Sequence, residues 1–160
     1  MSLRRPLAIL LLALATCVAA APSASASASR SARAYQSALV TAINGARAAN
    51  GVGPLRVDLR LTAAAKGQSS YLAAAGKLDH LGPDGATVFD RLAQQGFHGH
   101  MVGENLAAGM GPAATVQAWL ASPGHRMNLL EPGFHVLGVG VVMGSLGGMS
   151  APFVTADFGS

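Results

Sequence analysis

Cysteine is almost absent from this 160-residue chain, in which Cys17 is the only one. A chain with a single cysteine cannot form an internal disulfide, so its fold has to rest on its apolar core alone. If processing removes the segment that contains Cys17, the remaining protein has no thiol. The sequence is therefore not that of a small scaffold held together by disulfides.

Charged residues are also scarce, at 11% of the chain, and they form no basic run. Without Arg4 and Arg5, nine basic residues remain against seven acidic ones. A nucleic-acid-binding surface needs clustered lysine and arginine, so this composition argues against a nucleic-acid partner. Because acids and histidines are few, the position of each one is informative.

No apolar run is long enough to cross a bilayer comfortably. The longest extends from Leu7 to Ala21, interrupted by Thr16, whereas a spanning helix takes about 20 apolar residues. This run follows Arg4 and Arg5 and leads into small residues with Ala-x-Ala spacing. We therefore predict a secretory signal peptide over residues 1–21 and a secreted, extracellular protein without a stable membrane span.

Two alternatives stay open for this first segment. One is a membrane anchor, which the shortness of the run disfavours. The other is a lipid anchor at Cys17, because Leu14-Ala15-Thr16-Cys17 weakly resembles a lipoprotein cleavage box. Thr16 stands where that signal usually has Gly, Ala or Ser, so we favour a protein without an acyl chain.

The rest of the chain divides into a short linker and one domain. Residues 22–33 consist of Ser, Ala, Arg and one Pro, and no large apolar side chain offsets the entropy of ordering them, so we expect a disordered linker. Residues 35–160 are enough for one domain with its own core. We expect this domain to be a monomer.

Helical patterns come first along the domain, and a pair of strands comes last. Apolar residues recur at helical spacing from Tyr35 to the Asn50-Gly51 stop, and Asp58 is a candidate N-cap for an alanine-rich helix that ends near Gly76. Shorter helices are predicted over residues 87–95 and from Pro112. Strands are predicted over residues 102–107, 136–143 and 153–158, the last two joined by a glycine-rich hairpin. This order indicates an α+β fold rather than a doubly wound parallel sheet.

A few polar residues stand out as candidates for chemistry. Glu104 lies in the apolar stretch 101–108, where a carboxylate needs a hydrogen-bond partner or a cation. His80 follows a predicted helix, and His125 lies near the start of a predicted helical turn. Taken singly, each has an ordinary interpretation: Glu104 bonded to backbone amides, His125 bonded to a backbone carbonyl, and His80 on the surface. We expect His98 and His100 in a solvated loop and His135 at the start of a strand.

Taken together and in order, several segments resemble one family. They are Asn44-x-x-Arg47, Leu55-x-x-Asp58-x-x-Leu61, His80 before the turn 82–85, Gly103-Glu104-Asn105, Ala118-Trp119, Ser122-Pro123-Gly124-His125-Arg126-x-Asn128, Gly138-Val139-Gly140 and Asp157-Phe158-Gly159. The pattern is similar to a bacterial, cysteine-free member of the CAP superfamily of cysteine-rich secretory, antigen 5 and pathogenesis-related proteins. The resemblance covers about residues 35–160.

The resemblance implies a three-layer α-β-α sandwich around a small antiparallel sheet, with a cleft that carries two histidines and two glutamates. His80 and His125 stand at the histidine positions and Glu104 at the first glutamate position, whereas Ser122 occupies the second. These three residues are the candidate ligands for zinc or another divalent metal. The resemblance also implies that the cleft is flanked by Ser122, Asn105, Arg126 and Asn128.

The function implied by this resemblance stays open between three classes. The first is an extracellular binding module with a His/Glu cleft able to hold a divalent metal. The second is a metal-assisted hydrolase of extracellular peptide or cell-wall material, and the third is a carrier of a lipid or sterol. The partner is accordingly a small polar, lipid or cell-wall ligand, and the sequence assigns no catalytic residue. A Ser122 nucleophile with His125 as its base is disfavoured, because helix capping accounts for Ser122.

Overall fold

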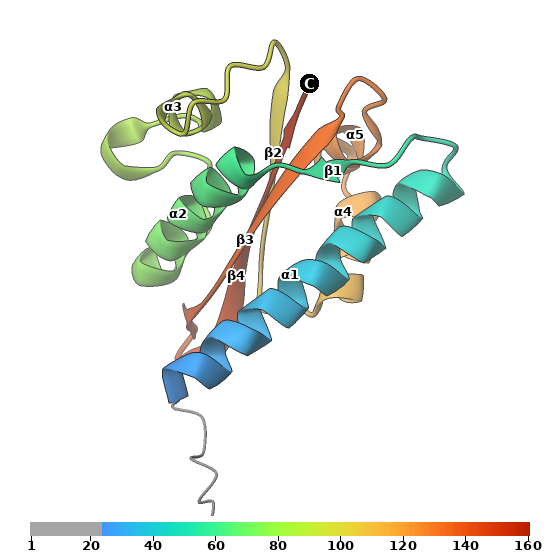
Figure 1. Cartoon of the computed structure of the whole chain (residues 1–160). Coiled ribbons are helices and arrows are strands. Elements are labelled where there is room, and N and C mark those ends of the chain that lie inside the picture. The colour runs from blue at the N-terminus through green and yellow to red at the C-terminus, as the bar shows by residue number, and fades with distance from the viewer. Residues whose placement is uncertain (1–23) are drawn as a thin grey trace, which may run out of the picture.

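A computed structural model describes residues 24–160 (Figure 1). The predicted signal peptide and Cys17 lie outside the described residues and stay predictions. The elements in chain order are α1 (Ala24–Ala49), β1 (Arg56–Val57), α2 (Leu59–Ala75), a 3-10 turn (Pro83–Gly85), α3 (Val88–Gln94), β2 (Val102–Ala108), α4 (Pro112–Ala121), α5 (Pro123–Leu130), β3 (Val136–Leu146) and β4 (Met149–Gly159). Among these helices, none has the length and apolarity needed to cross a membrane.

The four strands form one sheet in the order β1-β3-β4-β2. Strands β3 and β4 are an antiparallel hairpin, and β2 adds antiparallel to β4, with Glu104 directly opposite Asp157. The two-residue strand β1 lies parallel to β3, so the sheet is mixed at this edge rather than wholly antiparallel as expected. The parallel pairing is possible because a long crossover, which contains most of the domain, separates β1 from β3.

Helices cover both faces of the sheet, which confirms the predicted α+β sandwich (Figure 1). Helix α2 lies along β3 and β4 on one face, and α1, α4 and α5 lie together on the other. The approach of α2 is close: a Cβ built on Gly138 would collide with the carbonyl carbon of Leu61, and one on Gly140 would collide with the carbonyl oxygen of Ala65. The two glycines of the Gly138-Val139-Gly140 motif therefore let the backbone of α2 rest on β3.

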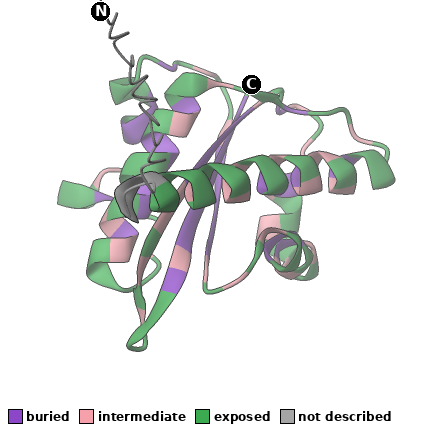
Figure 2. Ribbon diagram, turned by 60° about the horizontal axis from the view of Figure 1, so that its bottom comes forward, coloured by how far each residue is buried: buried purple, intermediate pink, exposed green. Residues whose placement is uncertain are grey.

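The main core lies between the sheet and the layer formed by α1, α4 and α5. Its largest member is Trp119, which is 1% exposed and whose indole Nε1 donates a hydrogen bond to the Leu106 carbonyl at 2.9 Å. Figure 2 shows the burial concentrated along the strands and the inward sides of the helices, while the outward sides are exposed. Burial of an amphipathic face thus holds each helix in place, as the apolar spacing predicted.

Local signals placed most element boundaries correctly. Asp58 caps α2 by accepting hydrogen bonds from the backbone amides of Arg60 and Leu61, and Gly76 ends this helix in the left-handed conformation. Thr87 forms a capping box with Asp90 at the start of α3. The start of α1 differs from expectation, because the helix begins at Ala24 and includes residues 24–33 of the expected linker. Alanine has the highest helix propensity of all residues, so this composition can extend a helix that is anchored further along.

Asn44 and Arg47, from the motif Asn44-x-x-Arg47, form hydrogen bonds that connect the end of α1 to neighbouring segments. The buried guanidinium of Arg47 donates from Nε to the Gly53 carbonyl at 2.7 Å and from Nη1 to the Leu129 carbonyl at 2.9 Å. Asn44 exchanges two hydrogen bonds with the backbone of Leu55. The end of α1 is therefore tied to the segment before β1 and to the end of α5, the helix that carries His125.

Candidate functional site

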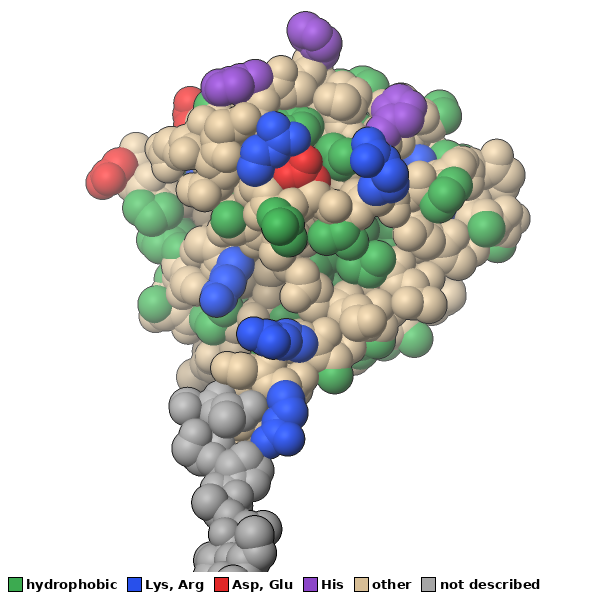
Figure 3. Space-filling view, in the orientation of Figure 1, with side chains coloured by type: hydrophobic (Ala, Val, Ile, Leu, Met, Phe, Trp, Pro, Cys, Tyr) green, Lys and Arg blue, Asp and Glu red, His purple; other side chains and the backbone are tan. Residues whose placement is uncertain are grey.

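A cleft of about 540 Å³ brings together most of the residues that the family resemblance singled out. It lies between the loop after α2, strand β2 and helix α5. Its lining comprises His80, Leu81, Thr87, Val88, Glu104, Ser122, Gly124, His125, Met127 and Asn128. In Figure 3 the histidine side chains visible on this face stand apart from one another, at the end of the molecule where α3 and the C-terminus lie in Figure 1. His98 and His100 are in the loop before β2, and neither lines the cleft.

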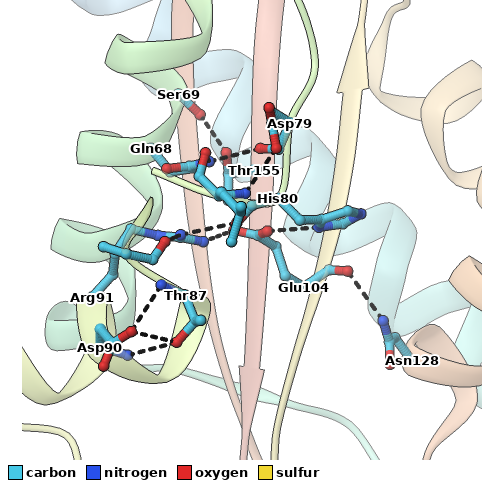
Figure 4. A network of polar contacts seen from close by, with 12 residues as sticks. Gln68, Ser69, Asp79, His80, Thr87, Asp90, Arg91, Glu104, Asn128 and Thr155 are labelled. Atoms are coloured by element: carbon cyan, nitrogen blue, oxygen red, sulfur yellow. Dashed lines mark hydrogen bonds and ion pairs between the residues drawn. The ribbon is translucent and has the colours of Figure 1, made fainter. Parts of the chain in front are cut away.

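The side chain of Glu104 is buried beside the cleft and is bonded to other side chains, so it is not a free ligand. It lies in the middle of β2, and its side chain is 2% exposed. One carboxylate oxygen, Oε1, is 2.8 Å from His80 Nδ1, and the other, Oε2, accepts a hydrogen bond from the guanidinium of Arg91 (Figure 4). Both oxygens of the carboxylate are therefore engaged inside the protein.

Arg91 is the cation that this buried carboxylate requires, and sequence reasoning missed it. It lies on α3, is itself buried, and donates from Nη1 to the backbone carbonyls of His80 at 3.1 Å and Ala86 at 2.8 Å. The same side chain thus neutralises Glu104 and holds the loop that carries His80. The sequence carried no clear signal for it, because neighbouring residues of a helix point in different directions, so the position of Arg91 beside Leu92 does not predict that it is buried.

His80 is positioned through its neighbours in the chain as well as through its own ring. Gln68 of α2 donates a hydrogen bond to the Asp79 carbonyl at 2.8 Å, and the Asp79 carboxylate accepts one from the Leu81 amide at 3.0 Å. Since the Glu104 carboxylate can only accept, the proton of a neutral His80 ring lies on Nδ1. The lone pair is then on Nε2, for which no partner occurs among residues 24–160, and the side chain is 62% exposed.

His125 forms the opposite wall of the cleft. It is half-buried on α5, with its ring centroid 6.5 Å from that of Trp119. Burial, and to a smaller extent the positive charge that His80 can carry, lower the pKa of His125. The ring is therefore neutral at neutral pH and presents a lone pair on one nitrogen.

The predicted neighbours of the cleft divide into three groups. Asn128 lines it and donates hydrogen bonds to the Glu104 carbonyl and to the Asn105 side chain. Asn105 is fully buried and does not line the cleft, but its side-chain amide donates a hydrogen bond to the His125 carbonyl at 2.9 Å. Arg126 faces away from the cleft toward Asn50, so its prediction as a cleft neighbour was wrong. Successive residues of α5 point in different directions, which is why His125 and Arg126 separate.

Ser122 lines the cleft at the junction of α4 and α5. It occupies the N-cap position of α5, yet its side chain makes no capping hydrogen bond, so the expectation that capping accounts for this residue was wrong. No hydrogen bond joins its hydroxyl to the His125 ring in the described part of the chain. A nucleophile and its base are therefore not assembled at this position.

Asp157 is a second buried carboxyl group close to the site, and the sequence marked it only as part of a motif. It is fully buried opposite Glu104 in the β2–β4 register, and neither oxygen has a hydrogen-bond partner among the described residues. Burial, and secondly the negative charge of Glu104, raise the pKa of Asp157, against the opposing effect of Arg91. Like Glu104, Asp157 is an acid inside an apolar strand, and it could have been singled out on the same ground.

The expected set of three metal ligands does not fit this arrangement. Residues 24–160 contain no group of three or more His, Cys, Asp or Glu side chains placed to hold an ion. In addition, Arg91 and His80 already bind both oxygens of Glu104. The donors that remain in the cleft are the imidazoles of His80 and His125.

Comparison with known proteins identifies the family. The model of the CAP family, described as the cysteine-rich secretory protein family, matches residues 40–158. The chain therefore belongs to this family, which confirms the resemblance. It is 35% identical over 113 residues to a Bacillus subtilis (strain 168) protein named "Uncharacterized protein YkwD", covering 70% of this chain and 44% of that protein. The chain thus spans less than half the length of this relative.

Solved structures agree with the fold. An extracellular protein containing an SCP domain from Bacillus anthracis (str. Ames) has a TM-score of 0.76 at 28% identity, over 88% of this chain and 45% of that one. An outer surface protein from Borrelia burgdorferi has a TM-score of 0.63 at 26% identity, over 76% of this chain and 89% of that one. Relatives of the chain thus include extracellular and surface proteins.

Proposed function

We propose that the chain is a secreted binding module whose cleft holds its ligand through His80 and His125. This proposal rests on one observation: both carboxylate oxygens of Glu104 are already bound within the protein, one by Arg91 and one by His80. The polar groups left to meet a ligand include the two imidazoles and the Ser122 hydroxyl, while Leu81, Val88 and Met127 provide apolar surface beside them. Such a cleft suits a small ligand with one polar and one apolar part.

The same donors support a divalent metal ion as part of the bound ligand. A carboxylate behind a histidine, as Glu104 stands behind His80, is the usual arrangement around metal-bound imidazoles, because it fixes the tautomer and the ring orientation. Two imidazoles leave the remaining coordination positions to water or to a ligand. Glu104 then acts as the orienting group and not as a direct ligand, which revises the three-ligand hypothesis.

Calorimetric titration with zinc tests this proposal. His80→Ala and His125→Ala should each weaken zinc binding strongly, whereas His98→Ala, a histidine outside the cleft, should leave it unchanged. Glu104→Gln should weaken it about 10–100-fold, the usual effect of losing an orienting partner. Affinity should also fall in acid, since only neutral imidazole binds metal. Equal affinity in the wild type and all three histidine variants would refute the metal part of the proposal.

A hydrolase is less well supported than a binding module. Glu104 is buried and paired, so it cannot act as the base of a hydrolase, and that role would fall to an imidazole that no second side chain of the described cleft orients toward a nucleophile. Ser122 is not hydrogen-bonded to His125 within the described chain. Turnover of a peptide or cell-wall substrate that is lost in His125→Ala would overturn this preference.

A further inference from the structure

The sheet has an open edge on the side away from the cleft. Strand β1 pairs only with Val136 and Leu137, so beyond them the outer side of β3 has no neighbouring strand in the described chain. Figure 1 shows this part of β3 passing between α2 and α1. The cleft lies at the opposite edge, where β2 carries Glu104, so the two sites are separate.

Every second residue of β3 turns its backbone groups toward this open edge. The N–H and C=O of one strand residue point to the same side, and those of the next residue point to the other side. The Leu137 carbonyl accepts a hydrogen bond from the Asp58 amide on the outer side, which fixes the series. Val141, Met143 and Ser145 therefore present their N–H and C=O groups outward, where no backbone group of the described chain pairs with them.

This part of the edge is accessible and unprotected. Met143 is 53% exposed, Ser145 is exposed and Val141 is half-buried. Proteins usually protect a free edge with a charged side chain, a proline or a bulge, each of which hinders the addition of another strand. Residues 139–146 contain no charge and no proline, and their one-to-one pairing with β4 has no bulge. An edge in this state can pair with another extended chain.

Helix α1 places positive charge beside the open edge. Its first turns and β3 line a shared cavity of about 330 Å³, to which α1 contributes Ala32 and Tyr35 and β3 contributes Met143. Arg30 and Arg33 belong to the same turns of α1 and are exposed. The helix contains no acidic residue that would balance them.

Helix α2 adds positive charge from the other face of the sheet. Its backbone rests on β3, because a Cβ built on Gly140 would come within 2.4 Å of the Lys66 amide nitrogen. The side chain of Lys66 is exposed, and α2 also contains no Asp or Glu. Figure 3, drawn in the orientation of Figure 1, shows Lys and Arg side chains spread along this face of the molecule. The open edge therefore lies between two helices whose charged residues are all basic.

We propose that the open edge of β3 binds an extended, acidic peptide segment, which adds to the sheet as a further strand. The outward backbone groups of Val141, Met143 and Ser145 pair with the peptide backbone, and the basic residues of α1 and α2 attract its carboxylates. A second copy of this chain suits the edge less well, because two basic faces would then meet and repel each other. The proposal does not depend on the function proposed for the cleft.

Amide hydrogen exchange, followed by NMR, tests for the added strand. The probe is a capped heptapeptide of alternating glutamate and valine. At saturation it should slow exchange of the Val141, Met143 and Ser145 amides at least about ten-fold. The amides of Val142 and Gly144, which point toward β4, should change less. Unchanged exchange of the three outward amides at saturating peptide would overturn the proposal.

Three comparisons separate strand addition from attraction by charge alone. A heptapeptide of alternating lysine and valine should give no protection, and equal protection by it would refute the preference for an acidic partner. An acidic peptide with N-methyl groups on alternate amides, which cannot donate to the edge, should bind much more weakly. Equal binding of this peptide would refute strand pairing. Protection that rises with protein concentration in the absence of peptide would identify a second copy of the chain as the occupant and overturn the proposal.

Matched variants test the edge and its charges separately. Met143→Pro removes an outward N–H that the sheet does not use, a change that edge strands tolerate, so it should weaken peptide binding about ten-fold, whereas Met143→Ala should have a much smaller effect. Arg33→Gln and Lys66→Gln should each weaken binding about two- to five-fold, the range for an exposed ion pair. Arg126→Gln, on α5, is the control and should change nothing. Wild-type affinity in both Met143→Pro and the two charge variants would refute the site, while NMR signals outside β3 report whether each variant is folded.

Discussion

The buried pair of Arg91 and Glu104 leads to a specific prediction about stability. Their side chains are 7% and 2% exposed, so neither charge can be screened by water when its partner is removed. Breaking a buried ion pair by deleting one member typically costs about 3–5 kcal/mol. Arg91→Met keeps most of the apolar stem of the side chain but leaves Glu104 charged and buried, and it also removes the donor to the His80 and Ala86 carbonyls. We therefore expect a loss of about 3–5 kcal/mol in the free energy of unfolding.

Urea denaturation of three variants measures this loss and its origin. Arg91→Met combined with Glu104→Gln should be less destabilised than the sum of the single variants, because no unpaired charge remains. Arg60→Met is the matched control: Arg60 pairs with Asp58 at 2.7 Å, but its side chain is 51% exposed, so its loss should be much smaller. A loss below about 1 kcal/mol in Arg91→Met would show that the pair is not the anchor of the cleft.

Three further predictions concern the core, the second carboxyl group and the N-terminus. Trp119→Ala should cost about 3–5 kcal/mol in urea denaturation, and Trp119→Phe should cost less because it keeps most of the ring volume and loses mainly the bond to Leu106. Because the folded protein raises the pKa of Asp157, its ionisation opposes folding, and wild-type stability should fall as the pH rises through that pKa. Asp157→Asn should therefore gain stability relative to the wild type as the pH rises above the ordinary pKa of an aspartate, in urea denaturation, and a constant difference would contradict a buried protonated acid. Secreted protein should begin between Pro22 and about Ser31 without an acyl chain, and mass spectrometry that finds a lipidated Cys17 would refute the predicted cleavage.

Local chemistry explains why most of the fold could be predicted from the sequence. Asp58, Gly76 and Thr87 act within a few residues of their own positions, so helix ends follow from the residue types alone. The strand pair at the end of the chain is equally local, since Gly147 and Gly148 both adopt the positive φ of a tight hairpin turn. The parallel edge strand β1 could not be predicted in this way, because its partner Val136 lies far along the chain.

The site was predictable only where a motif marked it. His80, Glu104 and His125 were found through family resemblance, and the structure places them in one cleft. Arg91, the cation that pairs with Glu104, was not found, because its proximity to Glu104 depends on the packing of α3 against β2. Glu104 lies opposite Asp157 on the neighbouring strand. This pairing depends on the tertiary structure and could not be predicted from spacing in the sequence.

The effect of a serine at position 122 depends on whether the carboxylate of Glu104 is free. In the family pattern a second glutamate stands at this position, and it would present a carboxylate to the cleft beside His125. Here the position holds a hydroxyl, while the carboxylate of Glu104 is bound by Arg91 and His80 within the protein. No carboxylate oxygen of the described cleft is then free to act as a base or to bind a cation directly. Chemistry in this cleft therefore depends on the Ser122 hydroxyl and on imidazole nitrogens, which bind metals and hydrogen-bond donors when neutral and bind anions when protonated.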